Sequence, residues 1–315
     1  MVINTKYNNN NNNNPEMIII EENKNECNTH FHFIFLVIAS KSDIYQSFLS
    51  CWKEYMQNSV QEWNIKCFFV FSDPSISCDL FISNDTIIYK GEENLKPGIF
   101  LKTMAALQYC EKKYTYDYIL RTNLSSFFYI PRLLRFIENN KTNDVNIYSP
   151  VQLISKQHQH INSLWQTYWE MYELYFSTEI INKNTDYIPF LDGACFILSK
   201  EIVSILLQNM DNTTTIGCSF IPWYKHLNHT YLDITIIPDD ILISMILQRI
   251  LDQHEFNYKW LSIPITTISN DSLLEELGED IFFIRNRIDD ANNREQDVTN
   301  YIQQVRYFYN KTVIL

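Results

Sequence analysis

From Phe31 onward, apolar runs of strand length alternate with amphipathic stretches of helix length. Such alternation is typical of βαβ units, so the sequence predicts an α/β fold with a mostly parallel central sheet flanked by helices. The expected strands are 33–38, 66–71, 86–89, 116–120, 146–148, 195–198, 260–263 and 280–284. The expected helices are 43–56, 99–112, 132–138, 163–176, 239–251 and 294–309.

The first 28 residues have a different composition from the rest of the chain. They include an uninterrupted asparagine run, residues 8–14, followed by Pro15. Because a polar low-complexity tract buries little apolar surface, we expect residues 1–28 to form a disordered tail. The main domain then covers 29–270, and a C-terminal strand and helix in 271–315 complete the same domain.

Composition narrows the classes of partner. With 46% hydrophobic residues, the chain has enough apolar material for a real core. Lys and Arg number 25 against 37 acids, so the net charge of -12 offers no electrostatic footprint for nucleic acid or an anionic membrane. Only five glycines occur, and neither a GxGxxG pattern nor a Walker loop is present, so a nucleotide must be held in another way.

Cysteines and apolar runs bear on the cellular location. The seven cysteines form no CxxC pairs, which favours buried free thiols and a reducing compartment. The longest apolar run, Phe33–Ile38 with its flanks, is far shorter than the ~20 residues that span a bilayer. We expect a cytoplasmic protein without a signal peptide. Abundant Asn and Ile suggest an AT-rich genome, and for a virus the location would be the host cytoplasm or the virion.

Three short motifs follow one another in a fixed order. The first combines Leu101-Lys102-Thr103-Met104 with Tyr118-Ile119-Leu120-Arg121-Thr122. The second is Asp192-Gly193-Ala194-Cys195-Phe196-Ile197-Leu198-Ser199, and the third is Pro238-Asp239-Asp240-Ile241. Together they resemble the beta-1,3-glycosyltransferases and their Fringe-type relatives over roughly Phe31 to Leu251. The resemblance implies a GT-A fold and transfer of a hexosyl or N-acetylhexosaminyl group from a UDP-sugar to a hydroxyl of a glycan or glycoprotein.

The family's metal-binding DxD motif is degenerate in this chain. Its place is taken by Asn123-Leu124-Ser125, whose neutral oxygens are weak ligands for Mg²⁺ or Mn²⁺. Two alternatives follow. Either a degenerate metal site persists while Asn123 and Ser125 bind the donor directly, or the enzyme dispenses with a metal. The second alternative is preferred, and no cofactor is predicted with certainty.

A metal-free transferase must neutralise the departing diphosphate with basic side chains. Arg285 and Arg287 alternate along a predicted strand and therefore share a face, and Arg294 follows them. The alternative is an ordinary ion pair with Asp289, Asp290 or Glu295. The full set of candidate donor-binding residues is Lys102, Arg121, Asn123, Ser125, Asp192, Gly193, Arg285, Arg287 and Arg294.

An inverting transferase needs a carboxylate that removes the proton of the acceptor hydroxyl. The resemblance favours Asp240 as this base, with Asp239 fixing the loop or contacting the acceptor; from the residues alone, Pro-Asp-Asp is a helix N-cap. Trp223 and Tyr224 are candidate acceptor-stacking side chains. A retaining transferase and an inactive GT-A domain that binds a glycan or a partner remain alternatives, and the oligomeric state stays open.

Overall fold

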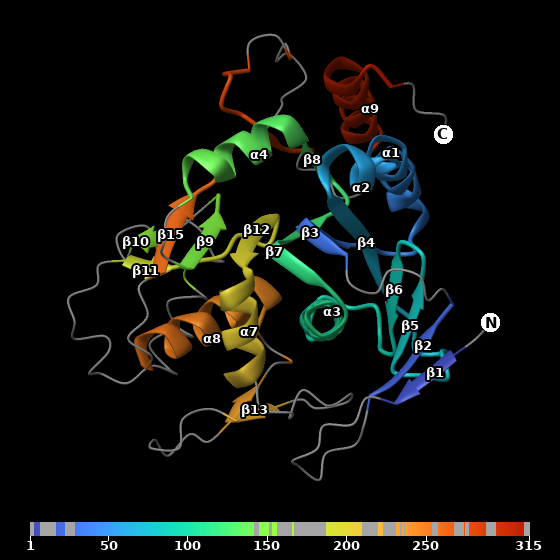
Figure 1. The fold of residues 1–315 in the computed structure, drawn as a ribbon, viewed down its shortest axis with the longest axis vertical. Helices are drawn as coiled ribbons and strands as arrows, with labels where there is room; N and C mark the ends of the chain where they lie inside the picture. Colours follow the sequence, from blue (N-terminus) through green and yellow to red (C-terminus); the bar gives the residue numbers. More distant parts are fainter. Residues whose placement is uncertain are drawn as a thin grey trace.

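The computed structural model describes residues 3–6, 17–22, 29–141, 145–150, 153–155, 166, 187–209, 220–222, 231–233, 235, 237–253, 258–267, 274, 277–287 and 294–311. Within them, ten strands form one sheet in the order β1-β2-β5-β6-β4-β3-β7-β12-β9-β15 (Figure 1). Their bounds are β1 Ile3–Lys6, β2 Ile18–Glu21, β3 His30–Ile38, β4 Ile65–Ser72, β5 Leu80–Ser83, β6 Thr86–Tyr89, β7 Thr115–Asn123, β9 Val145–Ser149, β12 Cys195–Ser199 and β15 Tyr258–Ser262.

Smaller strands accompany this sheet. A second sheet has the order β16-β17-β8, and two antiparallel two-stranded pairs are β10-β11 and β13-β14. Their bounds are β8 Ser126–Phe128, β16 Ile265–Thr267, β17 Phe283–Arg285, β10 Leu153–Ser155, β11 Tyr187–Pro189, β13 Phe220–Pro222 and β14 Tyr231–Asp233. The helices are η1 Asp43–Tyr45, α1 Gln46–Met56, α2 Ser59–Trp63, α3 Gly98–Lys113, α4 Ile130–Asn139, α7 Lys200–Asn209, α8 Asp239–Gln253 and α9 Glu295–Tyr309.

The centre of the main sheet is parallel. Strands β6, β4, β3 and β7 run in one direction, and β12 is the antiparallel neighbour of β7. The eight strands predicted from the sequence correspond to β3, β4, β6, β7, β9, β12, β15 and β17. The predicted α/β class with a mostly parallel, helix-flanked sheet is therefore confirmed. The aromatic helix predicted at 163–176 lies outside the described residues, except for residue 166.

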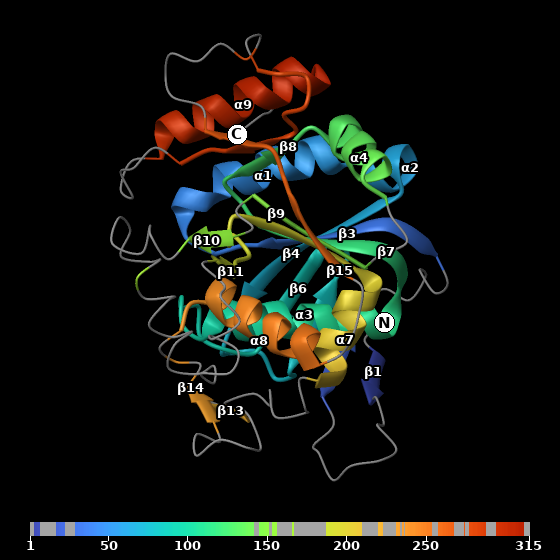
Figure 2. The same ribbon diagram turned by 90° about the vertical axis from the view of Figure 1, so that its left-hand side faces the viewer.

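Helices cover both faces of the sheet. Figure 2 shows α1, α2, α4 and α9 on one face and α3, α7 and α8 on the other. Because alternate residues of a strand point to opposite faces, Phe33 and Phe35 pack toward α1, while Ile34 and Leu36 pack toward α3. All four side chains are fully buried. Burial on both faces explains why the central strands are almost uninterrupted apolar runs.

The N-terminal expectation needs a correction. Residues 18–21 are not part of a disordered tail, because β2 pairs in parallel with β5 and extends the main sheet. Ile19 and Glu21 of this strand are buried. The physical reason is the isoleucine run 18–20, which supplies apolar surface despite the asparagine-rich sequence before it. The asparagine run itself, residues 8–14, lies outside the described residues.

The C-terminal elements share a core with the sheet. β17 pairs with β8, and α9 packs on α1. Tyr301 of α9 is fully buried and its hydroxyl donates a hydrogen bond to the Ser126 carbonyl oxygen at 2.8 Å. Five cysteines of the described part are free and buried, as predicted: Cys51, Cys67, Cys78, Cys110 and Cys195. None of the helices in the described ranges has the length and apolar character needed to cross a membrane.

Candidate active site

The order of the parallel strands marks one edge of the sheet as a candidate ligand site. From β3 the chain moves to β4 on one side, whereas the later strand β7 lies on the other side of β3. In open α/β sheets, ligands bind at the carboxyl ends of strands where the connection changes direction in this way. Here those ends are Ile38 and Asn123, which are direct partners in the register. The site predicted from the motifs therefore lies where a parallel sheet places a ligand.

The turn after β7, Asn123-Leu124-Ser125, is the segment predicted to replace the metal motif. The Asn123 amide oxygen accepts hydrogen bonds from the hydroxyl groups of Ser125 and Ser126, each at 3.0 Å. Ser126 also donates to the Ala194 carbonyl oxygen at 3.2 Å. The Ser125 carbonyl oxygen accepts from the Asn286 backbone N–H at 2.9 Å. Both side chains and backbone of this turn are thus already engaged within the fold.

These contacts decide whether a divalent cation fits the turn. Mg²⁺ and Mn²⁺ prefer carboxylate oxygens, and Asn123 and Ser125 supply none. The Asn123 oxygen would also have to give up two hydroxyl donors to coordinate an ion. No group of three or more His, Cys, Asp or Glu side chains in the described residues has a metal-binding arrangement. Asn123 and Ser125 thus offer a divalent ion no charged oxygen ligand, and independence of a metal stays a prediction.

The segment before β12 lies beside this turn. Cys195 pairs with Thr122 of β7, so Gly193 and Ala194, which precede Cys195, lie beside the carboxyl end of β7. The Asp192 carboxylate accepts a hydrogen bond from the Ala194 N–H at 2.7 Å, as a turn-forming residue does. The Asp192 N–H in turn donates to the Ser149 hydroxyl at 2.9 Å. Asp192 thus fixes the local backbone, and its predicted donor contact stays a prediction.

Arg121 of β7 joins this segment to the start of α8. Its side chain is 3% exposed, and its two terminal nitrogens donate to the Gly193 carbonyl oxygen and the Asp239 carboxylate. The guanidinium group also lies 5.6 Å from the Phe196 ring centroid. Because these contacts employ both terminal nitrogens, Arg121 acts here as a connector between β7, β12 and α8.

Asp240 is the second residue of α8 and has a different environment from Asp239. One carboxylate oxygen accepts the Ile241 N–H at 2.9 Å. The other lies so close to Gly193 that a Cβ atom there would approach it to 2.8 Å. Burial of the carboxyl group, followed by the negative charge of Asp239, raises the pKa of Asp240 from 3.8 to about 6. The Ile241 N–H and Arg121 act in the opposite direction. A carboxylate with this pKa is suited to accept a proton near neutral pH.

The three predicted basic residues differ in their surroundings. Arg285 pairs with Ser126 across β17 and β8, which places it beside the Asn123 turn. Its Nε atom is buried and has no hydrogen-bond partner among the described residues. Arg287 follows in an exposed position. Arg285 therefore lies near the turn, and donor binding by Arg285 and Arg287 remains a prediction.

Arg294, the third of these residues, is engaged within the fold. Its Nε lies 2.6 Å from the carboxylate of Asp297, which is fully buried. One terminal nitrogen donates to the Asn286 carbonyl oxygen at 2.8 Å, and the guanidinium group stacks on Tyr45 and Phe48. The ion-pair partner of Arg294 is Asp297, which the sequence analysis did not name, and Asp289 and Asp290 lie outside the described residues. Because its charge is compensated, we leave Arg294 out of the proposed donor site.

Lys102 of α3 is also enclosed. Its ammonium group donates to the Ala39 carbonyl oxygen at 2.9 Å and to Glu93 at 2.6 Å. Glu93 accepts a further hydrogen bond from the Ser72 N–H at 3.1 Å. Burial lowers the pKa of Lys102, and the charge of Glu93 opposes that effect. Lys102 thus ties together the carboxyl ends of β3 and β4, and direct donor contact by it stays a prediction.

Sequence reasoning missed an ion pair at the same edge of the sheet. Lys41 follows β3 and contacts Asp73, which follows β4. This pair and two hydrogen bonds from Ser75 hold the pKa of Asp73 below its usual range. The available signal was their shared position directly after a buried strand. Asp117 lies near the opposite end of β7 and contacts His30 and His32.

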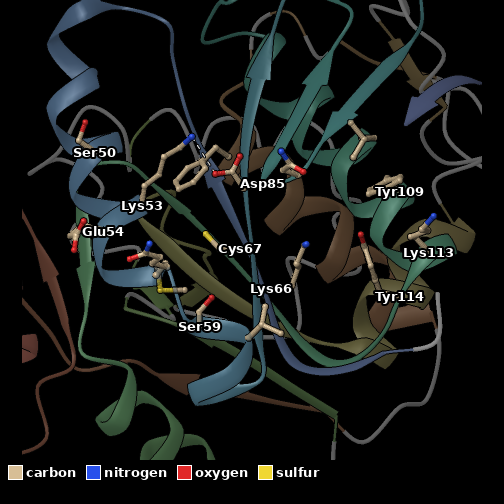
Figure 3. A pocket seen from close by; sticks show the side chains of 16 residues that line it. Ser50, Lys53, Glu54, Ser59, Lys66, Cys67, Asp85, Tyr109, Lys113 and Tyr114 are labelled. Atoms are coloured by element: carbon tan, nitrogen blue, oxygen red, sulfur yellow. Dashed lines mark ion pairs between the residues drawn. The ribbon is translucent and has the colours of Figure 1, made fainter. Parts of the chain in front are cut away.

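The described residues also contain a cavity of about 830 Å³, which is separate from the candidate site (Figure 3). It borders the first half of β4, the turn between β5 and β6, and the last turn of α3. Its Lys53 pairs with Asp85 at 3.2 Å, and Lys113 pairs with Glu21 at 2.7 Å. None of the motif residues lines this cavity. The predicted acceptor residues Trp223 and Tyr224 lie outside the described residues.

Comparisons with known proteins bear on the family. Residues 84–219 match the model of the family described as Galactosyltransferase. This segment contains the first two motifs and the Asn123 turn, whereas Asp240 and Arg285 lie outside it. No curated protein sequence matches the chain.

Solved structures give distant likenesses. A glycosyltransferase involved in the glycosylation of the major capsid of PBCV-1 has 8% identity and a TM-score of 0.38, covering 85% of this chain and 98% of that one. Mouse xyloside xylosyltransferase 1, apo form, has 12% identity and a TM-score of 0.37, covering 77% and 89%. The inositol-1-phosphate CTP transferase from T. maritima has 9% identity and a TM-score of 0.36, covering 88% and 96%. At these TM-scores we base no conclusion on them.

The family match thus falls on the part of the chain whose motifs predicted it. The resemblance to the galactosyltransferase family is confirmed over residues 84–219.

Proposed function

We propose that the protein transfers a hexosyl or N-acetylhexosaminyl group from a UDP-sugar to a hydroxyl of a glycan or glycoprotein, with inversion and without a metal ion. The observation that supports this proposal most is the Asp240 carboxylate, packed against Gly193 at the carboxyl edge of the sheet. Its raised pKa, about 6, suits a general base. The match of residues 84–219 supplies the reaction class.

In the proposed reaction, Asp240 accepts the proton of the acceptor hydroxyl as its oxygen attacks the anomeric carbon. The new carbon–oxygen bond forms while the bond to the diphosphate breaks, so UDP leaves with the bonding electron pair. Attack from the side opposite the leaving group inverts the configuration. A positioned base typically contributes about 10²- to 10⁴-fold to the rate of such a step.

The diphosphate needs positive charge as it departs. We assign this role to Arg285 and Arg287, because Arg285 lies opposite Ser126, beside the turn that replaces the metal motif. Arginine presents several donors in a planar fork that matches phosphate oxygens. In this proposal, the side chains of Asn123 and Ser125 only form hydrogen bonds with the donor, because their neutral oxygens are weak ligands for a divalent ion.

A metal-dependence assay tests this part of the proposal. Purified protein is incubated with a panel of UDP-, GDP- and dTDP-sugars, and binding is measured by calorimetry with and without Mn²⁺. Transfer to glycan acceptors is then measured in EDTA. We expect UDP-sugar binding and transfer that EDTA leaves unchanged. Loss of transfer in EDTA, with recovery on adding Mn²⁺, would contradict arginine neutralisation.

The second candidate function is an inactive domain that binds a glycan or a partner. The observation in its favour is the carboxylate-free Asn123 turn, whose side chains hydrogen-bond to one another. The two functions differ in UDP-sugar turnover. A binding module would neither transfer nor hydrolyse the donor, whether Asp240 is intact or replaced. Measurable turnover that depends on Asp240 would exclude it.

A further inference from the structure

Two adjacent carboxylates begin α8, and a general base requires that one of them accept the proton. We propose that Arg121 and Asp239 form a positioning pair that leaves Asp240 as the proton acceptor. The inference rests on the proposed function and deepens it. It also reassigns Arg121, which the sequence placed among the donor-binding residues.

The contacts of Arg121 support this assignment. One terminal nitrogen donates to the Asp239 carboxylate, and the other donates to the Gly193 carbonyl oxygen. The guanidinium group is 3% exposed and Asp239 is 8% exposed, so the pair is shielded from solvent. Through Gly193, the same arginine also sets the position of the backbone against which the Asp240 carboxylate packs.

The two carboxylates consequently differ in their charge balance. Asp239 has a cation in direct contact, whereas the described hydrogen-bond donor to the Asp240 carboxylate is the neutral Ile241 N–H. Two like charges side by side disfavour double ionisation, so the carboxylate without the cation takes up the proton more readily. Asp239 is therefore the carboxylate anchored to Arg121, and Asp240 is the carboxylate without a cation in direct contact.

The charges that act on Asp240 come from three described elements. Asp239 lies beside it on α8, Arg121 faces it from β7, and Asp192 faces it from the segment before β12. Asp239 and Asp192 favour its protonated form, while Arg121 favours the anion. Lys102 of α3 faces the Arg121–Asp239 pair. Removing Asp239 or Arg121 should hence shift the titration of Asp240 in opposite directions.

The test measures the acidic limb of kcat/KM against pH in three variants. Asp239→Asn removes the neighbouring anion and should move the limb to lower pH by about one pH unit. Arg121→Gln removes the cation and should move the limb to higher pH by a similar amount. The double variant removes both charges and should return the limb toward that of the wild type.

A second buried arginine–aspartate pair supplies a matched control. Asp297→Asn breaks the Arg294–Asp297 pair, and Asp297 is fully buried. This variant should lose thermal stability while its acidic limb stays at the wild-type pH. If the Arg121 and Asp239 variants behave in the same way, the pair is structural and our inference fails. If Arg121→Gln weakens UDP binding in calorimetry without moving the limb, Arg121 binds the donor instead.

A titration without turnover separates this inference from the proposed function. Protein labelled with carboxyl-¹³C aspartate is titrated by NMR, and the Asp240 signal is identified by its loss in Asp240→Asn. We expect the same opposite displacements in Asp239→Asn and Arg121→Gln. If the displacements occur in a protein without transferase activity, the proposed function fails and the pairing stands. If the single variants do not fold, the double variant provides the test. An Asp240 signal that titrates as in the wild type, at wild-type stability, agrees with compensation between the two charges. A displaced Asp240 titration refutes the inference.

Discussion

Replacing Asp240 by Asn tests the base assignment and the environment of this carboxyl group together. Asn has nearly the same shape as Asp, carries no charge and retains an oxygen that can accept the Ile241 N–H. The substitution therefore removes proton acceptance while changing the packing against Gly193 little. We expect turnover to fall and folding stability to rise, whereas UDP binding is kept.

The structure gives the size of the stability effect. The pKa of Asp240 rises from 3.8 to about 6 on folding, so the folded state binds more protons than the unfolded state between these values. Stability is then lost as the pH rises through this range, and the loss is complete above about pH 6. One pKa unit corresponds to about 1.4 kcal/mol, so Asn should stabilise the protein at neutral pH by up to about 3 kcal/mol. Below pH 4 the gain should disappear.

The kinetic effect follows from general base catalysis. Loss of a positioned base lowers kcat by about 10²- to 10⁴-fold, or about 3 to 5 kcal/mol in the barrier. Donor consumption and acceptor glycosylation are measured together, and thermal unfolding is followed at pH 4 and pH 7.5. Asp280→Asn, at an exposed position, controls for a generic aspartate replacement. Normal transfer by Asp240→Asn would refute the base assignment, and an unchanged melting temperature at pH 7.5 would refute the burial argument.

Two further predictions concern the donor charge and the glycine contact. Arg285→Gln and Arg287→Gln should each raise the donor KM about tenfold, because a hydrogen bond to a charged group contributes about 1.5 to 3 kcal/mol. The control variant Arg306→Gln, at an exposed position on α9, should leave the donor KM unchanged. An equal rise of KM in the control would indicate a nonspecific charge effect and contradict the assignment. Gly193→Ala should lower kcat about 10²-fold by displacing the base carboxylate, since a misplacement near 1 Å has an effect of that size. Gly278→Ala, where a Cβ atom meets nothing within 4 Å, should leave kcat unchanged, and equal kcat values for the two glycine variants would refute the contact argument.

Wild-type kcat/KM should also fall about tenfold per pH unit below pH 6, because the protonated base is inactive.

Hydrophobic periodicity was sufficient for the main elements. The apolar run 33–38 predicted β3, and the amphipathic stretch 43–56 predicted η1 with α1. Such long, strongly patterned segments leave the chain few other ways to bury their side chains. Strand β8 was not predicted, because three residues carry too little pattern and form a strand only where a neighbouring strand is available. Strand β2 was not predicted, because the asparagine run before its isoleucines led us to expect disorder throughout residues 1–28.

The sequence by itself determined the family resemblance, the missing carboxylates at Asn123 and Ser125, and the identity of Asp240 as a candidate base. These depend on residue type and order along the chain. Only the tertiary structure decided which charged side chains form ion pairs within the fold. It paired Arg121 with Asp239 and Arg294 with Asp297, contacts that depend on how β7, α8 and α9 pack. A buried charge is compensated by whatever the fold places within a few ångströms, and that neighbour cannot be read from a single strand or helix.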